Sequence, residues 1–226
     1  MSSSILVSAF SSAGLPARED LKAAAKRFAT PKVMRFLDNM ALPAYVAGMS
    51  ALAGCPGVDP LTCGVMTVTN WDPTYHQPEL PEDGPQGFQG VATYYRQQAS
   101  PTGWLRKMMN NTNCHVCVSG KLQGPNLHFA GWSPALVDAL FFSDRLLETG
   151  AAEHMLVLAF DAPPGEESTH DPAGTASAIV LARTAAGQGT FEIPPLGSGH
   201  PEVGSVAMLD RLIAEAATLE VASSVA

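Results

Sequence analysis

Short apolar runs alternate with longer segments of helical spacing along the chain, and this pattern predicts both strands and helices. Apolar runs of strand length predict strands at Ile5–Phe10, Cys63–Thr69, Leu127–Ala130, His154–Phe160 and Ala176–Ala182. We also expect Thr190–Ile193 to pair with the last of these runs across Gly187–Gly189. Strands separated by helices are typical of α/β domains, so we predict a three-layer α/β fold with a mixed five-stranded sheet flanked by helices.

Apolar residues at helical spacing predict the helices that would cover this sheet. We expect helices at Pro16–Phe28, Pro31–Leu52 with a bend at Pro43, Val91–Gln98, Thr102–Asn111 and Val203–Val221. The stretch from Trp71 to Gly90 is rich in proline, glycine and acidic residues, which predicts a long loop. A loop of that length in a compact domain usually serves a function or an interaction.

The segment after Leu127–Ala130 contains the most distinct helix, because both of its ends are marked. Ser133 is a good N-cap residue, Pro134 suits the first helical position, and Gly150 suits the position just past the helix. An apolar stripe between these ends predicts a mostly buried helix. A strand, a tight corner and a buried helix place the helix N-terminus beside the corner residue, where many α/β enzymes hold a nucleophile.

Composition and charge narrow the choice of partners and location. The 226 residues suit one large domain, 1–226, and only 15% of them are charged, so we expect much of the surface to be uncharged or covered by another chain. The net charge is −8 and we expect no basic cluster, which argues against nucleic acid and anionic membrane as partners. There is no long apolar run and no leader-like start, and the four cysteines form no obvious framework, so we expect a cytoplasmic protein.

Three segments that together cover most of the chain resemble a known family. The first is Ile5–Phe10 with Gly14-Leu15-Pro16, the second runs from Ser100 to Asn126, and the third comprises Leu136–Asp161 with Gly174–Leu181. The second is the most specific, because an Asn and a helix of small residues lead to Gly124-Pro125-Asn126. In this order of residues the chain resembles the N-terminal half of a β-ketoacyl synthase, which implies a thiolase-like half fold.

Two departures from the synthase pattern decide what the resemblance implies. In active synthases a cysteine occupies the corner, whereas the matching position here is Trp132 or Ser133. A thiolate can accept an acyl group from a carrier thioester near neutral pH, but an unactivated serine cannot. The family's two catalytic histidines come from a C-terminal half that we expect to be absent, and none of the six histidines here matches them. We therefore assign no catalytic residue.

A half-length chain without the cysteine resembles a chain length factor, the non-catalytic subunit that pairs with a full ketosynthase. The short form is similar to those of type II polyketide systems that make aryl polyene pigments. The resemblance implies a heterodimer in which this subunit shapes the acyl tunnel of its partner, without a cofactor or a metal. Because the loops of this chain are acidic, we expect the ketosynthase to bring the basic patch for the acyl carrier protein, which would meet this chain only indirectly.

The resemblance also implies which residues would face the partner and its tunnel. The strand Asn126–Gly131 would pair across the dimer, and a helix from Thr102 to Val118 would line the far end of the tunnel. Bulky side chains on that helix would limit the length of the acyl chain. The candidates for the tunnel or the partner interface are Trp104, Met108, Met109, Asn113, Asn126, Phe129 and Trp132.

A stand-alone hydrolase is the first alternative. The run Gly131-Trp-Ser-Pro-Ala135 half-matches a nucleophile elbow around Ser133, and Asp161 and His200 follow in hydrolase order. That site needs the backbone N–H of the residue after the serine for its oxyanion hole, and Pro134 has none. Losing one such donor typically costs about 3 kcal/mol of transition-state stabilisation, so the N-cap role of Ser133 is the better interpretation.

A metal-bound or homodimeric binding module is the second alternative. Cys114 and Cys117 form a single Cys-x-x-Cys pair, and Cys55 and Cys63 would have to complete a four-thiolate zinc site. Structural zinc sites usually combine two closely spaced pairs, and the second pair is missing here. Cysteines at 114 and 117 also share one face of a helix and pack well as small apolar residues, so packing is the simpler interpretation.

Overall fold

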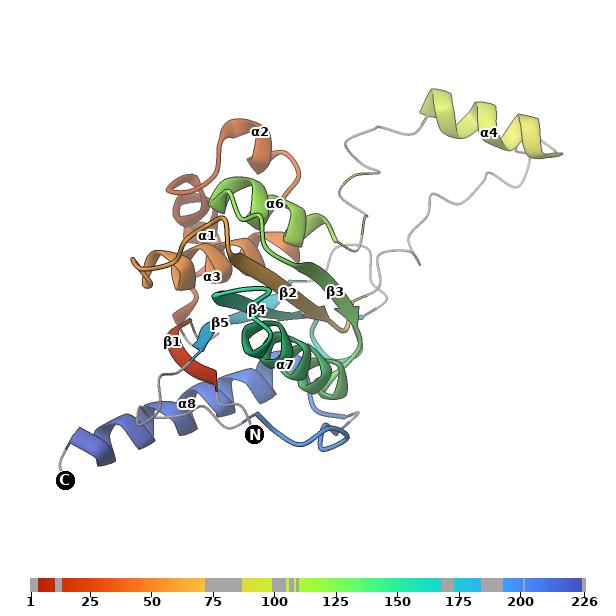
Figure 1. Ribbon diagram of the computed structural model, residues 1–226. Coiled ribbons are helices and arrows are strands. Elements are labelled where there is room, and N and C mark those ends of the chain that lie inside the picture. The colour runs from red at the N-terminus through yellow and green to blue at the C-terminus, as the bar shows by residue number, and fades with distance from the viewer. Residues whose placement is uncertain are drawn as a thin grey trace.

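The fold was analysed in a computed structural model, which describes residues 4–10, 14–71, 87–98, 105, 108, 110–167, 173–183, 193–200 and 202–224 (Figure 1). Within these residues the chain forms one α/β unit in which helices cover both faces of a sheet. The expected α/β class is confirmed.

Five strands form one mixed sheet in the described part of the chain. They are β1 (Ser4–Phe10), β2 (Cys63–Thr69), β3 (Asn126–Ala130), β4 (His154–Asp161) and β5 (Thr175–Arg183), in the order β1-β5-β4-β2-β3. β2 pairs in parallel with β3 and β4, whereas β5 pairs antiparallel with β4 and β1. All five main strands expected from the sequence are confirmed, including the continuous apolar run that forms the covered strand β4.

The two faces of the sheet pack against different helices because alternate residues of each strand point to opposite sides. Val65, Leu156 and Leu158 point to the layer made by α1 (Arg18–Lys26), α2 (Pro31–Met34), α3 (Ala41–Ala53) and α6 (Asn111–Gly120). Met66, Met155 and Val157 point to α7 (Ser133–Glu148) and α8 (Ser205–Ser224). Figure 1 shows this three-layer arrangement, with α7 and α8 below the sheet.

The helix expected from Pro31 to Leu52 with a bend at Pro43 is instead two helices. The chain leaves helical geometry after α2, and α3 starts at Ala41, where the Asp38 carboxylate accepts hydrogen bonds from the backbone N–H groups of Met40 and Ala41. Pro43 lies in the first turn of α3, where a missing N–H breaks no helical hydrogen bond. The expected bend at Pro43 is therefore wrong, because the break comes before the proline.

Other helices differ from the sequence prediction mainly at their ends. α4 (Gly87–Gln98) starts earlier than the helix expected there. α6 begins at Asn111, where a predicted helix was expected to end. α8 coincides with most of the final predicted helix. Most of the predicted helix 102–111 lies outside the described residues, and Met108 is not helical. The predicted strand 190–193 also lies outside them apart from Ile193, which belongs to no strand. Most of the predicted long loop, residues 72–86, is outside as well.

None of the helices in the described residues is long and apolar enough to cross a membrane.

Candidate functional site

The candidate site is the corner between β3 and α7, where the sequence places a helix N-terminus beside a possible nucleophile. Gly131 forms the corner with φ of +149°, a conformation that glycine tolerates better than other residues. Trp132 is the N-cap of α7 but makes no side-chain capping hydrogen bond, and Ser133 is the first helical residue. The expected N-cap role of Ser133 is therefore wrong, and Pro134 occupies the second helical position instead of the first. The expected end of the helix is confirmed, because Gly150 follows it with φ of +74°.

Ser133 is buried and holds a distant part of the chain against the start of α7. Its Oγ donates a hydrogen bond to the His200 carbonyl at 2.7 Å and accepts one from the His200 N–H at 2.8 Å. The Ser133 N–H donates to the Val203 carbonyl at 3.1 Å. We call Gly199, His200, Glu202 and Val203 the capping segment. It covers the helix N-terminus, where an enzyme of this architecture would admit a substrate.

The residues proposed for a hydrolase do not assemble into a catalytic triad. Ser133 bonds to the backbone of His200 and not to its imidazole, whose Nδ1 accepts from the Glu202 N–H at 3.4 Å. Asp161 bonds to backbone N–H groups elsewhere, as described below. With Pro134 unable to donate to an oxyanion, the geometry gives Ser133 a structural role.

We expect Ser133→Ala to lower the free energy of unfolding by about 1–3 kcal/mol, because the N–H and the carbonyl of His200 lose their buried partner. Thermal or urea unfolding measures this. Ser143→Ala is a matched control on the same helix, because the buried Ser143 hydroxyl bonds only to the Ala139 carbonyl within α7. We also expect a fluorophosphonate probe to leave the wild-type chain unlabelled. Labelling that disappears in Ser133→Ala would contradict the structural role.

Asp161 ends β4 and joins three elements through its carboxylate. Oδ2 accepts from the Val206 N–H at 2.8 Å at the start of α8, and Oδ1 accepts from the Asn70 N–H at 3.2 Å just after β2. A negative charge at a helix N-terminus is favourable, but the side chain is only 5% exposed. Burial raises the pKa of Asp161 to about 6, and the hydrogen bonds from Val206, Asn70 and Ser205 oppose that rise. The carboxylate therefore fixes α8, and with it the capping segment, to the end of the sheet.

β3 is an edge strand, with β2 on one side and no strand of the described residues on the other. Its side chains at Asn126 and Leu127 are exposed, while His128 and Phe129 are half-buried. Asn113 is buried on α6 and its Nδ2 donates to the Leu127 carbonyl at 2.9 Å, which fixes the strand to that helix. Asn126 donates in turn to the Cys117 Sγ at 3.1 Å.

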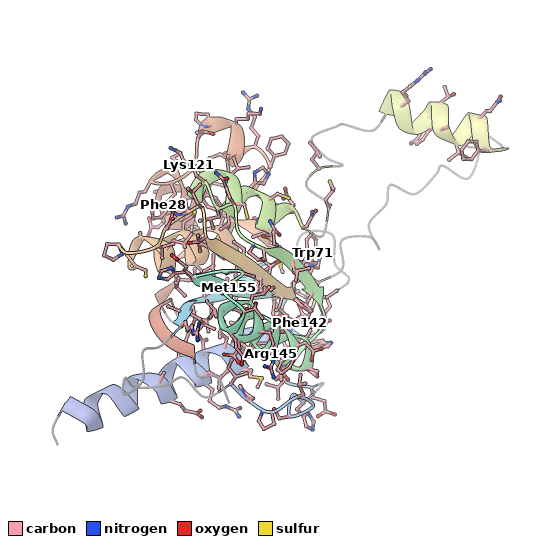
Figure 2. The ribbon with its side chains drawn as sticks, viewed as in Figure 1. Phe28, Trp71, Lys121, Phe142, Arg145 and Met155 are labelled. Atoms are coloured by element: carbon pink, nitrogen blue, oxygen red, sulfur yellow. The ribbon has the colours of Figure 1, made fainter. Side chains whose placement is uncertain are left out.

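Apolar side chains flank this edge on both neighbouring helices. Phe142 on α7 is 47% exposed and its ring lies 5.9 Å from that of Phe129. Leu127 is 44% exposed and Val118 on α6 is 67% exposed. Figure 2 shows Phe142 and Arg145 on the same helix below the sheet. An unpaired strand edge with exposed apolar neighbours is typical of a surface that another chain covers.

The residues predicted to face the partner or its tunnel fall into three groups. Asn113, Asn126 and Phe129 gather at the β3 edge, and the half-buried Trp132 caps α7 next to it. Met108 is 49% exposed and precedes α6, so it does not lie on one helix running from Thr102 to Val118. Trp104 and Met109 lie outside the described residues. The roles of all seven residues stay predictions.

The sequence reasoning did not single out His128 on β3, whose ring lies 6.5 Å from that of Phe160 on the sheet face that α3 and α6 cover. Its Nδ1 lies 2.8 Å from the Thr67 Oγ1 on β2, while its Nε2 is buried without a hydrogen-bond partner among the described residues. Burial lowers the pKa of His128 to about 4, so the imidazole is neutral at pH 7. A histidine inside an otherwise apolar strand was the only signal in the sequence.

The cysteines do not form a metal centre within the described part of the chain, where no group of three or more His, Cys, Asp or Glu side chains could hold an ion. All four thiols are free. Burial raises the pKa of Cys63 to about 12 and that of Cys117 to about 11, so both are protonated at neutral pH and poor metal ligands. The packing interpretation therefore fits them better than zinc.

Comparison with known proteins finds relatives only at the level of structure. No family model matches the sequence, and no curated protein matches it. Among solved structures, the ishigamide ketosynthase/chain length factor matches with a TM-score of 0.52 and 18% identity, over 84% of this chain and 64% of that one. A type II polyketide acyl-carrier protein in complex with its ketosynthase bound to the hexaketide matches with a TM-score of 0.55 and 11% identity, over 81% and 63%.

A third structure, the ketosynthase ApeO in complex with its chain length factor ApeC from Xenorhabdus doucetiae, matches with a TM-score of 0.51 and 16% identity. This match covers 81% of this chain and 80% of that one. The chain has the ketosynthase fold. The thiolase-like fold expected from the resemblance is thereby confirmed. This ketosynthase-fold chain spans less than two thirds of the first two matched chains, and its low identity to all three makes the likeness one of fold.

Proposed function

We propose that this ketosynthase-fold chain is a non-catalytic subunit resembling a chain length factor. It forms a heterodimer with a full ketosynthase and shapes the tunnel that holds the growing acyl chain, in polyketide or fatty-acid-like biosynthesis. The observation that carries the proposal is the closed N-terminus of α7. It has no thiol and is covered by the capping segment through Ser133.

The chemistry of that corner supports a role without catalysis. Acyl transfer from a thioester needs a nucleophile with access to substrate and a donor for the developing oxyanion. Ser133 has no exposed surface, its hydroxyl is engaged twice, and the next residue lacks an N–H. A chain with this corner can still support a fold and an interface, which is what a structural subunit requires.

The β3 edge supports a dimer partner of the same architecture. No strand of the described residues pairs with the outer side of β3, and Leu127, Val118 and Phe142 provide exposed apolar surface on β3, α6 and α7. Removing apolar surface from water is the dominant favourable term in most protein–protein association. Two of the matched structures are described as a ketosynthase with its chain length factor, which is consistent with this arrangement.

The position of α6 supports the tunnel role. Asn113 near its start is buried and bonded to β3, so the start of α6 lies near the proposed interface. Met108 is exposed there and is our described candidate for limiting the acyl chain. Trp104 and Met109 remain candidates from the sequence, and the acyl carrier protein would reach the tunnel through the ketosynthase.

We expect Leu127→Arg to weaken binding to a ketosynthase encoded beside this chain by at least about tenfold. A charge would enter an apolar interface next to the unpaired edge, and one order of magnitude corresponds to about 1.4 kcal/mol. Co-expression followed by size-exclusion chromatography and a titration measures the affinity. Leu61→Arg is the control, because Leu61 is 62% exposed and lies outside β3.

Three outcomes separate the alternatives. A wild-type chain that stays monomeric and does not co-elute with the ketosynthase would overturn the proposal. A homodimer that Leu127→Arg dissociates would favour the acyl-binding homodimer instead. Equal loss of affinity in Leu127→Arg and Leu61→Arg would show that β3 is not the interface.

A further inference from the structure

A run of cations on α1 and α2 contrasts with the acidic character of the whole chain. Residues 21–37 contain no Asp or Glu, although the net charge of the chain is −8. Five of the 13 Lys and Arg residues fall within this run, and all five side chains are exposed: Lys22, Lys26, Arg27, Lys32 and Arg35. We call these five residues the basic surface. The expectation that the chain has no basic cluster is therefore wrong for this stretch, because the net charge conceals a local excess of cations.

An apolar pocket lined in part by Phe28 begins beside Arg27 of the basic surface. It has a volume of about 220 Å³ and lies between the loop after α1, the end of α3 and the end of α6. Its lining is Phe28, Met49, Leu52, Ala53, Cys55, Val58, Pro60, Gly120 and Leu122. Pockets for cofactors and drug-sized ligands usually measure about 300–1,000 Å³, so this one suits a single apolar side chain better than a small-molecule ligand.

Charged groups at the rim connect the pocket to the basic surface. Phe28 lines the pocket, and the Arg27 guanidinium lies 5.8 Å from the centre of its ring. Lys121 is exposed and lies between two lining residues, Gly120 and Leu122. Figure 2 shows Phe28 and Lys121 on the same side of the molecule, away from Phe142. Asp59 is the acidic residue between two lining residues, and its Oδ1 accepts from the Leu61 N–H.

We propose that the basic surface and the pocket together form a docking site for an acidic protein segment that inserts one apolar side chain. Cations beside an apolar pocket are complementary to a partner whose carboxylates surround an aliphatic or aromatic anchor residue. A concave pocket accepts a protruding side chain, whereas a flat bilayer surface would leave it unfilled. The chain's net negative charge does not prevent docking, because screening confines charge effects to about 8 Å at physiological salt.

The site is separate from the interface of the proposed function. It is built from α1, α2, α3 and the end of α6, and it uses neither α7 nor the exposed side chains of β3. The inference therefore does not depend on a ketosynthase partner. It also differs from the expectation that only the partner would bring basic groups, since this chain presents its own.

The test uses the full chain and a fluorophore-labelled 15-residue peptide of Glu, Asp and Ala with one central Leu, measured by anisotropy at 50 mM salt. We expect saturable binding that weakens as salt rises. Lys22→Glu with Lys26→Glu should weaken it at least tenfold, since both charges are exposed and reverse sign. Ala53→Trp, which fills the pocket mouth, and a peptide with Ser in place of Leu should each weaken it about tenfold.

The control variant carries Arg96→Glu and Arg211→Glu, which change net charge equally at exposed positions on α4 and α8. It should bind the peptide within about twofold of wild type. Absence of peptide binding, or an equal loss in the control, would overturn the proposal. Binding to vesicles of phosphatidylcholine with 20% phosphatidylserine that needs Lys22 and Lys26, without peptide binding, would replace it with a membrane surface.

Discussion

Gly199→Ala is expected to lower the free energy of unfolding by about 3 kcal/mol, the upper part of the range for overpacked positions. A Cβ at this position would lie 2.4 Å from the Pro134 nitrogen and 2.5 Å from its Cα. Both are backbone atoms at the start of α7, so no flexible side chain can move to relieve the contact. The capping segment would have to shift, and the hydrogen bonds between Ser133 and His200 would be lost with it.

Thermal unfolding should report this as a fall in Tm of roughly 6–12 °C for a domain of this size. Gly57→Ala is the control, because a Cβ there would meet nothing within 4 Å and no unusual φ is involved. The same Tm for Gly199→Ala and wild type would show that the capping segment does not pack against α7 as described. Amide hydrogen exchange at the start of α7 should also increase in the variant, since its cover moves away.

Asp161→Asn is expected to change how stability depends on pH. Burial raises the pKa of Asp161 from 3.8 to about 6 in the folded protein, so the folded state holds this proton more tightly than the unfolded chain. The contribution of this group to the free energy of unfolding is fully present below about pH 4. It is lost as the pH rises toward 6. A shift of about two pKa units corresponds to about 3 kcal/mol.

Urea unfolding of both proteins at several pH values between 4 and 7 measures the effect. The wild-type free energy of unfolding, minus that of Asp161→Asn, should fall by up to about 3 kcal/mol over this range, because asparagine cannot titrate. Contributions from the other carboxylates cancel in this difference. A difference that stays constant from pH 4 to pH 7, or that rises with pH, would contradict the raised pKa.

The strands could be predicted from the sequence because each is a short apolar run. β4 is the clearest case, since a strand that is covered on both faces needs apolar residues at successive positions. The ends of α7 were also nearly correct, because proline and glycine restrict the backbone locally. The break before α3 was not predicted. The break depends on the Asp38 carboxylate, which caps the start of α3 at Ala41. The sequence prediction instead placed a bend at Pro43, because proline commonly interrupts a helix.

The sequence correctly predicted where the candidate site lies, at the corner between β3 and α7. It did not predict the hydrogen bonds that Ser133 and Asp161 make. The corner, the missing thiol and the proline after Ser133 are all local features, and they already weaken a catalytic interpretation. His200 is 67 residues from Ser133, and Val206 and Asn70 are 45 and 91 residues from Asp161, so no local pattern indicates these partners. The basic surface was visible in residues 21–37, but its meaning needed the pocket, whose walls come from three separate segments.

The sequence by itself determined the α/β class, the run of each strand and the absence of a thiol at the head of α7, because burial and backbone restriction act on neighbouring residues. The tertiary structure alone decided that Ser133 closes the helix start, that Asp161 anchors α8, and that β3 is left at an edge. Hydrogen-bond partners and sheet order depend on which distant segments meet, and that is set by packing of the whole chain.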